Sequence, residues 1–329
     1  MTIHITDEEV KQLFKMPDAY DALHEAFSMA AAGDVLEPAR LELKIPGGWL
    51  RLQPGAMPKK GYFGYKAYGM TSQKGIRYVV YLYDINSGDL LAIVDADTLT
   101  VVRTGADSGV ATRYLSREDS RVLGVIGSGF QAGSLVDGVA HVRKLDKIRV
   151  YSRSRENREA FSARVEDRLG IKVEPVGAPS TAIKGSDIIG LATSNMGMTP
   201  IVSGDWFEPG MHINAIGAVG MGRVEVDNRT FERSSLVVVD ALEECIAGAQ
   251  ELIDALAAGA VRREQLVELS QIVSGKKPGR TSRSQMTLLK SQGSGVQDVA
   301  AAARIYELAS SKGFGTDIGD IAPALRQSK

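Results

Sequence analysis

Residues 122–132 read Val-Leu-Gly-Val-Ile-Gly-Ser-Gly-Phe-Gln-Ala, and this stretch decides the fold class. Residues 122–126 are a short apolar run that predicts a buried strand, and residues 132–142 follow a helical pattern. Between them Gly127, Gly129 and Ala132 form the pattern G-x-G-x-x-A. The first glycine allows a tight turn, the second lets a pyrophosphate approach the backbone, and the alanine lets helix and strand pack closely.

The start of the predicted helix is expected to bind phosphate. Its first N–H groups have no partner within the helix, and the positive end of the helix dipole lies there. We therefore expect a nicotinamide dinucleotide at this loop. The predicted contacts are Gly127, Ser128, Gly129, Phe130, Gln131 and Ala132.

The end of the second predicted strand indicates which dinucleotide binds. An NAD-selective site places a carboxylate there, for the ribose 2′-hydroxyl. This chain has Ser152, Arg153 and Ser154 instead. Because guanidinium groups pair well with phosphate, the sequence favours NADP. The alternative is a solvated arginine on a surface loop, with NAD accepted as well.

The rest of the chain divides into two kinds of pattern, as 329 residues would suggest. A capping box at Thr6 and Glu9 and a run from Pro17 to Gly33 predict two helices. Residues 38–100 predict strands joined by tight turns, hence an antiparallel sheet. From residue 122 strands and helices alternate, which predicts a parallel sheet with helices on both faces. The strands expected there are 122–126, 148–152, 187–193, 212–216 and 236–240, and a last helix is expected at 298–312.

Composition excludes several classes of protein. The formal net charge is −1, so the chain lacks the charge that would attract nucleic acid or an anionic membrane. No run of 18 apolar residues predicts a membrane span, and no signal peptide is visible. Cys245 is the single cysteine, which agrees with a cytoplasmic protein. The four histidines lack metal-ligand spacing, so we expect no metal.

Three cations lie in the strand-rich region. Lys66 is on a strand of tyrosines and glycines, where a half-buried lysine must reach water or find an anion. Arg103 lies in an apolar stretch just before a predicted helix, and Arg40 follows Glu37. Together they would suit a small carboxylate, although spacing alone favours a surface or structural role for each.

Two further features leave alternatives open. Six of the ten tyrosines lie between residues 62 and 83. They could line a ligand site, form a subunit interface, or pack on a half-buried sheet. The glycine-rich segment from Ser291 to Gly295 precedes a helix and could close over a ligand.

Several segments together resemble the ornithine cyclodeaminase/mu-crystallin family over nearly the whole chain. The resemblance implies a Rossmann-type doubly wound parallel sheet inserted in a discontinuous α+β domain for substrate binding and dimerisation. It also implies domain limits at 1–118 plus 297–329 and at 119–296, with homodimers formed through the sheet of the first domain. The segments are 99–108, 127–132, 199–201 with Trp206, 209–217, 223–227, and 287–291 with Gln297 and Asp298.

The resemblance also assigns roles. Lys66 matches a lysine beside the substrate carboxylate and the reacting carbon, and Arg103 matches an arginine that contacts substrate and cofactor. Both are therefore the candidate catalytic residues. Arg40 matches an outer carboxylate-binding arginine, and Ser291 matches a loop residue that touches substrate or nicotinamide. The segment 152–154 is similar to the mu-crystallin stretch that accepts the 2′-phosphate. Further cofactor contacts are expected at Thr193, Ile216 and Arg223.

Two departures from the family pattern bear on the reaction. Val219 stands where cyclodeaminases and alanine dehydrogenases of the family carry an aspartate, and Gly55 stands where cyclodeaminases carry a glutamate. Since valine cannot handle the protons of water and ammonia, we expect NAD(P)H-dependent reduction of the C=N bond of a small α-imino acid. One alternative is an amino-acid dehydrogenase or ornithine cyclodeaminase in which Glu225 manages water. Another is a small-ligand binding protein of the mu-crystallin type, dependent on NADP and without turnover.

Overall fold

The computed structural model describes residues 1–71 and 75–321. Contacts divide the chain into two compact units, which are Met1–Arg103 with Ser294–Lys329, and Thr104–Gly293. Helix α3 (Asp97–Leu115) passes through the limit between them. The first unit is thus discontinuous, and the second is inserted into it. The domain limits at 118/119 and 296/297 stay predictions, since a contact-based unit and a family domain need not end at the same residue.

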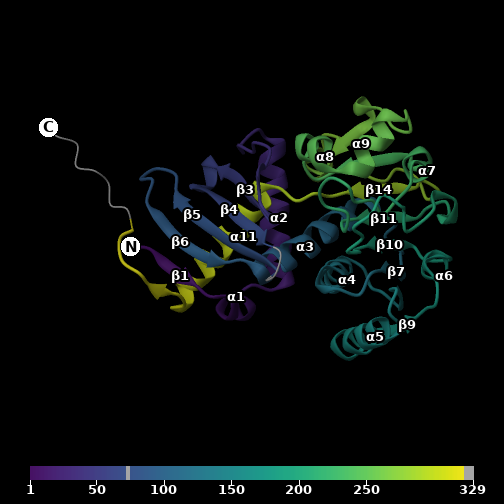
Figure 1. The fold of residues 1–329 in the computed structure, drawn as a ribbon, viewed down its shortest axis with the longest axis horizontal. Coiled ribbons are helices and arrows are strands. Elements are labelled where there is room, and N and C mark those ends of the chain that lie inside the picture. The colour runs from purple at the N-terminus through teal and green to yellow at the C-terminus, as the bar shows by residue number, and fades with distance from the viewer. Residues whose placement is uncertain (72–74, 322–329) are drawn as a thin grey trace. The chain divides into compact units, whose positions relative to one another are not determined.

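The first unit is built on a seven-stranded sheet, whose strands β1, β3, β4, β5 and β6 are labelled in Figure 1. Its strand order is β15-β1-β6-β5-β4-β3-β2. Strands β2 to β6 pair antiparallel with their neighbours in the chain, as predicted, and β1 joins β6 in parallel. The strands are β1 (Ile3–Ile5), β2 (Leu41–Ile45), β3 (Gly48–Met57), β4 (Tyr62–Thr71), β5 (Ile76–Asp84), β6 (Leu90–Asp95) and β15 (Thr316–Asp317).

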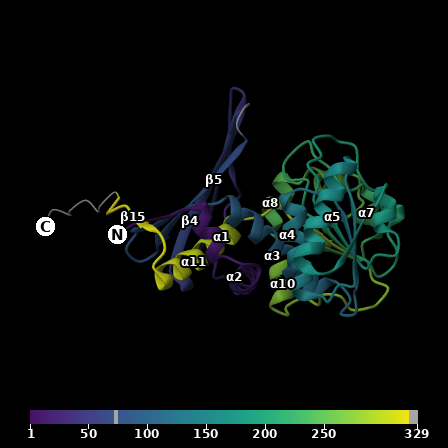
Figure 2. The ribbon, with the colours of Figure 1, turned by 90° about the horizontal axis from the view of Figure 1, so that it is seen from below.

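Three helices accompany this sheet: α1 (Asp7–Leu13), α2 (Met16–Ala31) and α11 (Gly295–Lys312), with a 3-10 turn η1 (Pro58–Lys60). The predicted capping box is present, because Thr6 accepts from the backbone of Glu9 and the Glu9 carboxylate accepts in return. The last helix begins earlier than predicted and ends at Gly313, whose φ of 72° is the left-handed value that favours glycine. In Figure 2, α11 and α2 lie on the same side of the sheet.

The two faces of this sheet differ. Lys66 and Tyr68 are buried on the face that α11 covers, and Tyr78 pairs with Tyr68 across the strands. Side chains at alternate positions point to opposite faces, so Tyr65 lies on the other face. The six tyrosines of this region therefore divide equally, with Tyr62, Tyr68 and Tyr78 on one face and Tyr65, Tyr81 and Tyr83 on the other.

The second unit holds an eight-stranded parallel sheet of order β13-β12-β14-β11-β10-β7-β8-β9. From β7 the chain moves outward to β8 and β9, and then returns to β10 on the other side. The order thus reverses between β7 and β10, where dinucleotides bind in such folds. The strands are β7 (Val122–Ile126), β8 (Lys147–Tyr151), β9 (Lys172–Pro175), β10 (Ile188–Leu191), β11 (His212–Ala215), β12 (Leu236–Val239), β13 (Leu266–Glu268) and β14 (Thr287–Lys290).

Helices cover both faces of the parallel sheet, as predicted. One hydrophobic cluster joins the strands to α4 (Phe130–Val142) and α5 (Arg155–Leu169). A second cluster lies on the opposite face and includes Phe231 of α7 and Leu252 of α9. The elements on that face are α6 (Pro179–Ile183), η2 (Gly204–Trp206), α7 (Asn228–Arg233), α8 (Leu242–Gly248) and α9 (Gln250–Ala257). A 3-10 turn η3 (Arg263–Gln265) precedes β13, and α10 (Leu269–Val273) follows it.

One predicted position is corrected by the structure. Arg103 lies inside α3 and not in a segment that precedes a helix. The β-branched residues around it favour strands, but the helix is largely buried and its packing outweighs that weak preference. The position of Arg103 in helix α3 directs its side chain to Asp298 and Gln297 of α11. No helix in the described residues is long and apolar enough to cross a membrane.

Candidate cofactor and substrate sites

The glycine loop follows β7 and leads into α4, as predicted. Gly127 has a φ of 122°, and a Cβ placed there would lie 2.3 Å from the Ala192 carbonyl oxygen. At Gly129 a Cβ would meet nothing within 4 Å. The loop is therefore closed against its neighbouring strand at the first glycine and open at the second, where a pyrophosphate needs room.

The start of α4 suits an anion. Gly129 is its N-cap and makes no side-chain capping bond, so the first N–H groups of the helix are left for a ligand. Phe130 is 87% exposed, and Ala132 is fully buried against the sheet. These residues fit the phosphates of a dinucleotide. Bound NADH or NADPH would supply the hydride of a reduction.

Other predicted cofactor residues gather at the same edge of the sheet. Strands β8, β7, β10 and β11 are neighbours and run in parallel, so the segments that follow them share one edge. Ser152, Arg153 and Ser154 follow β8, Thr193 follows β10, and Ile216 follows β11. Ile216 is buried in the core, so only its backbone could serve a ligand. Arg223 is half-buried in the loop before α7.

The segment after β8 is locally ordered by hydrogen bonds. Ser154 caps α5 by accepting from the Asn157 N–H at 3.1 Å. Ser152 donates to the Ser154 carbonyl oxygen, and Arg158 donates to the Ser152 carbonyl oxygen. Arg153 is exposed between them. The chain thus holds an exposed guanidinium at the strand end where the ribose is expected.

In the first unit, a buried aspartate joins two of the predicted cations. Lys66 Nζ lies 2.7 Å from Asp298 Oδ2, and Arg103 Nε donates to Asp298 Oδ1 at 2.9 Å. Arg103 also donates to Gln297 Oε1 at 3.1 Å. Asp298 is fully buried in the first turn of α11, where the helix dipole favours a negative charge. Sequence reasoning named Asp298 only within the family resemblance and gave it no role.

Arg40 reaches the same cluster through an aromatic residue. Its Nη1 donates to the Tyr68 hydroxyl at 3.1 Å. The Tyr68 ring lies 5.0 Å from Lys66 Nζ, and the Tyr78 ring lies 5.8 Å from it. The structure therefore brings Arg40, Lys66 and Arg103 into one cluster, with one carboxylate between two of the three cations.

The surroundings of Lys66 change the pKa of its ammonium group. Burial, together with the charges of Arg103 and Arg40, lowers the pKa of Lys66 to about 7, although Asp298 raises it. The lysine is therefore poised between its charged and neutral forms near neutral pH. An arriving anion would favour the charged form.

Ser291 is bound within the second unit. Its hydroxyl donates to Asp240 Oδ2 at 2.8 Å, and the Gly293 N–H donates to the same oxygen at 2.7 Å. Asp240 is 4% exposed. These bonds hold the loop that leads to α11, and a contact from Ser291 to substrate stays a prediction.

The two departures from the family pattern have clear structural settings. A Cβ at Gly55 would lie 2.6 Å from both Gly295 C and Val296 N, so β3 touches the start of α11 and leaves no room for a side chain. Val219 lies between two residues whose backbone groups are held by Gln292, because Gly220 N–H donates to its amide oxygen and its amide nitrogen donates to the Ala218 carbonyl.

The suggestion that Glu225 manages water is not supported. Glu225 is fully buried, and both carboxylate oxygens already accept backbone N–H groups. Its side chain is thus committed to the loops around it and is not available to a substrate.

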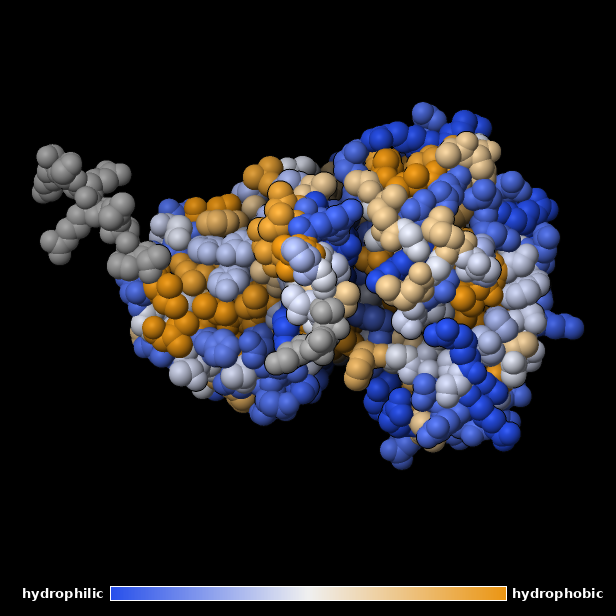
Figure 3. Space-filling view, viewed as in Figure 1, coloured by the Kyte–Doolittle hydropathy of each residue, from blue (hydrophilic) through white to orange (hydrophobic). Residues whose placement is uncertain are grey.

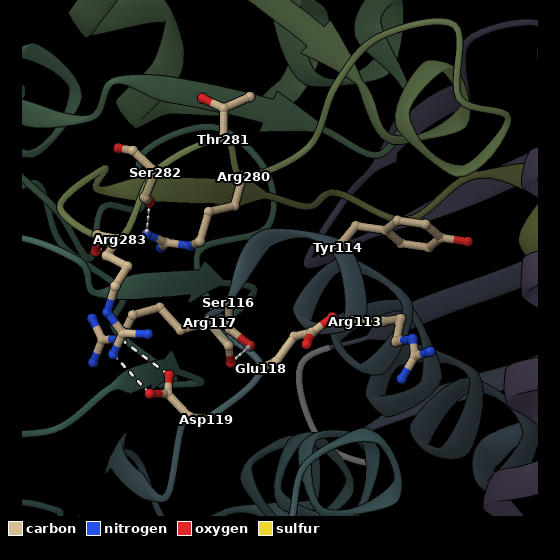
Figure 4. Close-up of a pocket in the computed structure, with 10 residues that line it drawn as sticks. All are labelled: Arg113, Tyr114, Ser116, Arg117, Glu118, Asp119, Arg280, Thr281, Ser282 and Arg283. Atoms are coloured by element: carbon tan, nitrogen blue, oxygen red, sulfur yellow. Dashed lines mark hydrogen bonds and ion pairs between the residues drawn. The ribbon is translucent and has the colours of Figure 1, made fainter.

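A hollow of about 490 Å³ lies on the second unit near the end of α3 (Figure 4). Four arginines line it, and three of them are engaged by other groups of the protein. Arg280 donates to Leu115, Ser282 and other carbonyl oxygens, and Arg117 pairs with Asp187. Arg283 pairs with Asp119 at 2.7 Å. The hydrogen bonds and ion pairs of these three arginines hold neighbouring loops together. In the described residues no group of three or more His, Cys, Asp or Glu side chains could hold a metal ion.

Comparison with known proteins agrees with this arrangement. The chain is 34% identical to alanine dehydrogenase of Archaeoglobus fulgidus, over 96% of this chain and 98% of that protein. It is 32% identical to ketimine reductase mu-crystallin of Mus musculus, over 85% and 88%. The solved structure of Thermococcus litoralis Δ1-pyrroline-2-carboxylate reductase in complex with NADH and L-proline matches with a TM-score of 0.91 and 30% identity, over 96% of this chain and 100% of that one.

The model of the ornithine cyclodeaminase/mu-crystallin family matches residues 2–313. The resemblance given by the sequence motifs is thereby confirmed. The chain belongs to the ornithine cyclodeaminase/mu-crystallin family and is an NAD(P)-dependent oxidoreductase of that family.

Proposed function

We propose that the protein is a ketimine reductase, which uses NADPH to reduce the C=N bond of a small α-imino acid such as pyrroline-2-carboxylate or piperideine-2-carboxylate. One observation carries the proposal. Three cations, Arg40, Lys66 and Arg103, share a cluster in which Asp298 is the bridging carboxylate. Three cations placed together suit one substrate carboxylate, since the pairing of an arginine or lysine with a carboxylate is stronger than a neutral hydrogen bond.

The missing acid at position 219 favours reduction over deamination. Deamination needs a group that manages the protons of water and ammonia at the reacting carbon. Val219 has no such group, and Glu225 is fully engaged by backbone N–H groups. A plain imine reduction needs a bound carboxylate, a hydride and one proton.

The reaction balances with the groups available. Bound NADPH would supply a hydride to the carbon of the C=N bond, and the nitrogen becomes an amine when it also holds a proton. A substrate that arrives as the protonated iminium needs no further proton. For a neutral imine, the Lys66 ammonium can donate the proton, because burial has lowered its pKa to about 7.

The direct test follows NADPH oxidation at 340 nm with pyrroline-2-carboxylate and piperideine-2-carboxylate. Turnover with an imino acid, and proline or pipecolate as product, is the expected result. The absence of turnover with every imino acid tried, while NADPH still binds, would overturn the proposal.

The second candidate is an amino-acid dehydrogenase, which the similarity to the Archaeoglobus fulgidus alanine dehydrogenase favours. It predicts ammonia release from alanine with NAD⁺, and ornithine tests the cyclodeaminase reaction in the same assay. A third candidate binds a small ligand with NADP and without turnover. The cation cluster argues against it, because an aromatic pocket needs no such charge.

For the cofactor we propose a preference for NADP. The support is the exposed Arg153 after β8, between two serines and with no carboxylate in the segment 152–154. Arg153→Ala is expected to raise the KM for NADPH about tenfold and to leave the KM for NADH unchanged, as loss of one charged contact to phosphate would. Equal effects on both cofactors, or none, would contradict this preference.

We also propose that the protein forms a homodimer through the sheet of the first unit. On the face opposite α11, Tyr65 stacks on Tyr81 and Phe63 on Tyr83, with ring centres 5.0 Å apart in both pairs. Figure 3 shows apolar side chains gathered over β5 and β6. Light scattering should give about twice the 35.3 kDa of one chain, and Tyr65→Lys should return it to one chain. A monomeric wild type would contradict the proposal.

A further inference from the structure

A buried carboxylate lies beneath two loops of the second unit. Glu225 is fully buried, and its Oε1 accepts from the Thr193 N–H at 2.7 Å. Its Oε2 accepts from Gly217 N–H at 2.8 Å and from Ala218 N–H at 3.0 Å. Thr193 follows β10, whereas Gly217 and Ala218 follow β11. One side chain thus accepts hydrogen bonds from three N–H groups of two neighbouring loops.

Two further buried side chains hold this arrangement. Glu251 accepts from the N–H groups of Glu225 and Val226, at 2.6 and 3.1 Å. Lys290, at the end of β14, pairs with Glu251 at 2.8 Å and donates to the Ala218 carbonyl oxygen at 2.9 Å. The loop around Ala218 is therefore held at its N–H by one charged group and at its carbonyl by another.

These loops are in direct contact with the glycine loop. A Cβ at Gly127 would lie 2.3 Å from Ala192 O, and a Cβ at Gly217 would lie 2.4 Å from both Thr193 N and Glu225 Oε1. From the glycine loop to Glu225 the backbones touch with no side chain between them. A displacement of Thr193 would therefore be transmitted to Gly127.

We propose that Glu225 is a positioning residue of the dinucleotide site, which holds the loops after β10 and β11 in the binding conformation before the cofactor arrives. The group does not touch the cofactor, because it is fully buried and its oxygens are occupied. Its effect is on affinity, since a site that is already ordered loses less entropy when a ligand binds. The proposal rests on dinucleotide dependence and not on the identity of the imine.

The charges of the cluster support this role. Burial, and then the charge of Glu251, raise the pKa of the Glu225 carboxyl, while Lys290 opposes them. Burial alone would lower the pKa of Lys290, but Glu251 and Glu225 raise it. The cluster thus holds two acids and one base, and the ionised Glu225 is retained because three N–H donors require an acceptor.

The test uses Glu225→Gln, which has the same size and one acceptor oxygen fewer. The NH₂ group must then face at least one backbone N–H, so one loop loses its anchor. The dissociation constants of NADH and NADPH, from nicotinamide fluorescence, are expected to rise about tenfold or more, as loss of a hydrogen bond to a charged group would predict. The midpoint of thermal unfolding without cofactor should change little, because the removal of one buried charge offsets the lost bonds.

Glu166→Gln is the matched control. Glu166 also accepts a backbone N–H, from Val173 at 3.0 Å, but lies in α5. Its dinucleotide affinity should equal that of the wild type. A folded Glu225→Gln variant that binds dinucleotide within about twofold of wild type would overturn the proposal.

A second measurement needs no variant. Amide hydrogen exchange of the wild type without cofactor should show Thr193, Gly217 and Ala218 protected, and added NADH should change this little. Fast exchange that slows only when NADH binds would mean that the cofactor, and not Glu225, orders the loops. Neither measurement uses an imine, so a failure of ketimine reduction would leave both readings intact.

Discussion

Each unit buries a lysine, and the two lysines have opposite surroundings. Lys66 in the first unit is 2% exposed, has Asp298 as its ion-pair partner, and has Arg103 and Arg40 nearby. Lys290 in the second unit is fully buried and faces the carboxylates of Glu251 and Glu225. Burial and two other cations lower the pKa of Lys66 to about 7, whereas two carboxylates raise that of Lys290 despite burial.

The charged groups beside each lysine distinguish a substrate-binding cluster from a positioning cluster. Around Lys66 two cations share the single carboxylate of Asp298, and an anionic ligand would be a further partner for them. Around Lys290 the carboxylates outnumber the cation, and backbone N–H groups complete the balance within the protein. The same residue type on a buried strand therefore serves a ligand in one unit and the loops in the other.

The largest expected effect is that of Lys66→Met on catalysis. Asp298 keeps Arg103 as its partner, so the fold should survive, but the substrate carboxylate loses a buried cation. We expect kcat/KM for the imine to fall on the order of 1000-fold, as loss of a buried charge pair predicts. Dinucleotide affinity should not change. A variant that retains most of its kcat/KM would contradict the assignment of Lys66 to the substrate.

Lys290→Met should act on stability instead. It leaves two carboxylates buried together without a cation, which predicts a loss of about 3–5 kcal/mol in the free energy of unfolding. Urea titration at pH 8 measures this loss. Since the pKa of Glu225 is already raised, acid protonates it, so the deficit against wild type should shrink as the pH falls. A Lys290→Met protein as stable as wild type would remove the contrast between the two clusters.

A smaller effect is expected on the pH profile. Lys66 is charged below its pKa, so kcat/KM should fall as the pH rises through about 7. Asp298 raises that pKa, and Asp298→Asn should move the descending limb to lower pH, with about a tenfold loss at pH 7.5.

The comparison between variants isolates Lys66 in that experiment, because the imine nitrogen of the substrate titrates equally in each. Asp95→Asn serves as the control, since Asp95 pairs with His4 on the same sheet. An unmoved limb in Asp298→Asn would show that Lys66 does not set the profile.

The two lysines also show how much of each cluster can be predicted from the sequence. A lysine on a buried strand needs an anion or water, and this rule singled out Lys66, which pairs with Asp298. The same rule applies to Lys290, which follows Leu288 and Leu289, and it would have found the second cluster. The partners could not be named, because Asp298 and Glu251 are distant in sequence from the lysines that they bind.

Sequence patterns predicted the structure best where interactions between residues close in sequence determine it. The glycine loop and the capping box of Thr6 and Glu9 depend on a few consecutive residues, and both were predicted. Strands β9, β13 and β14 of the parallel sheet were not predicted. β9 and β13 are short edge strands with charged residues. β14 has only four residues, and its place between β11 and β12 comes from pairing with strands distant in sequence. Arg103 was placed before a helix for a similar reason, since tertiary packing outweighs weak propensity.

The smallest effect concerns the contact between Gly55 of β3 and the start of α11, the helix that holds Asp298 next to Lys66. Gly55→Ala would place a methyl group 2.6 Å from the backbone of Gly295 and Val296, where no flexible side chain can yield. The first turn of α11 must shift, so we expect a loss of about 1–3 kcal/mol in stability and a lower kcat/KM with the imine. Gly177→Ala, where a Cβ meets nothing within 4 Å, is the control and should leave both unchanged. Because the contact is between backbones, a Gly55→Ala protein with normal stability would show that β3 and α11 can separate, and a glutamate at that position would then be possible.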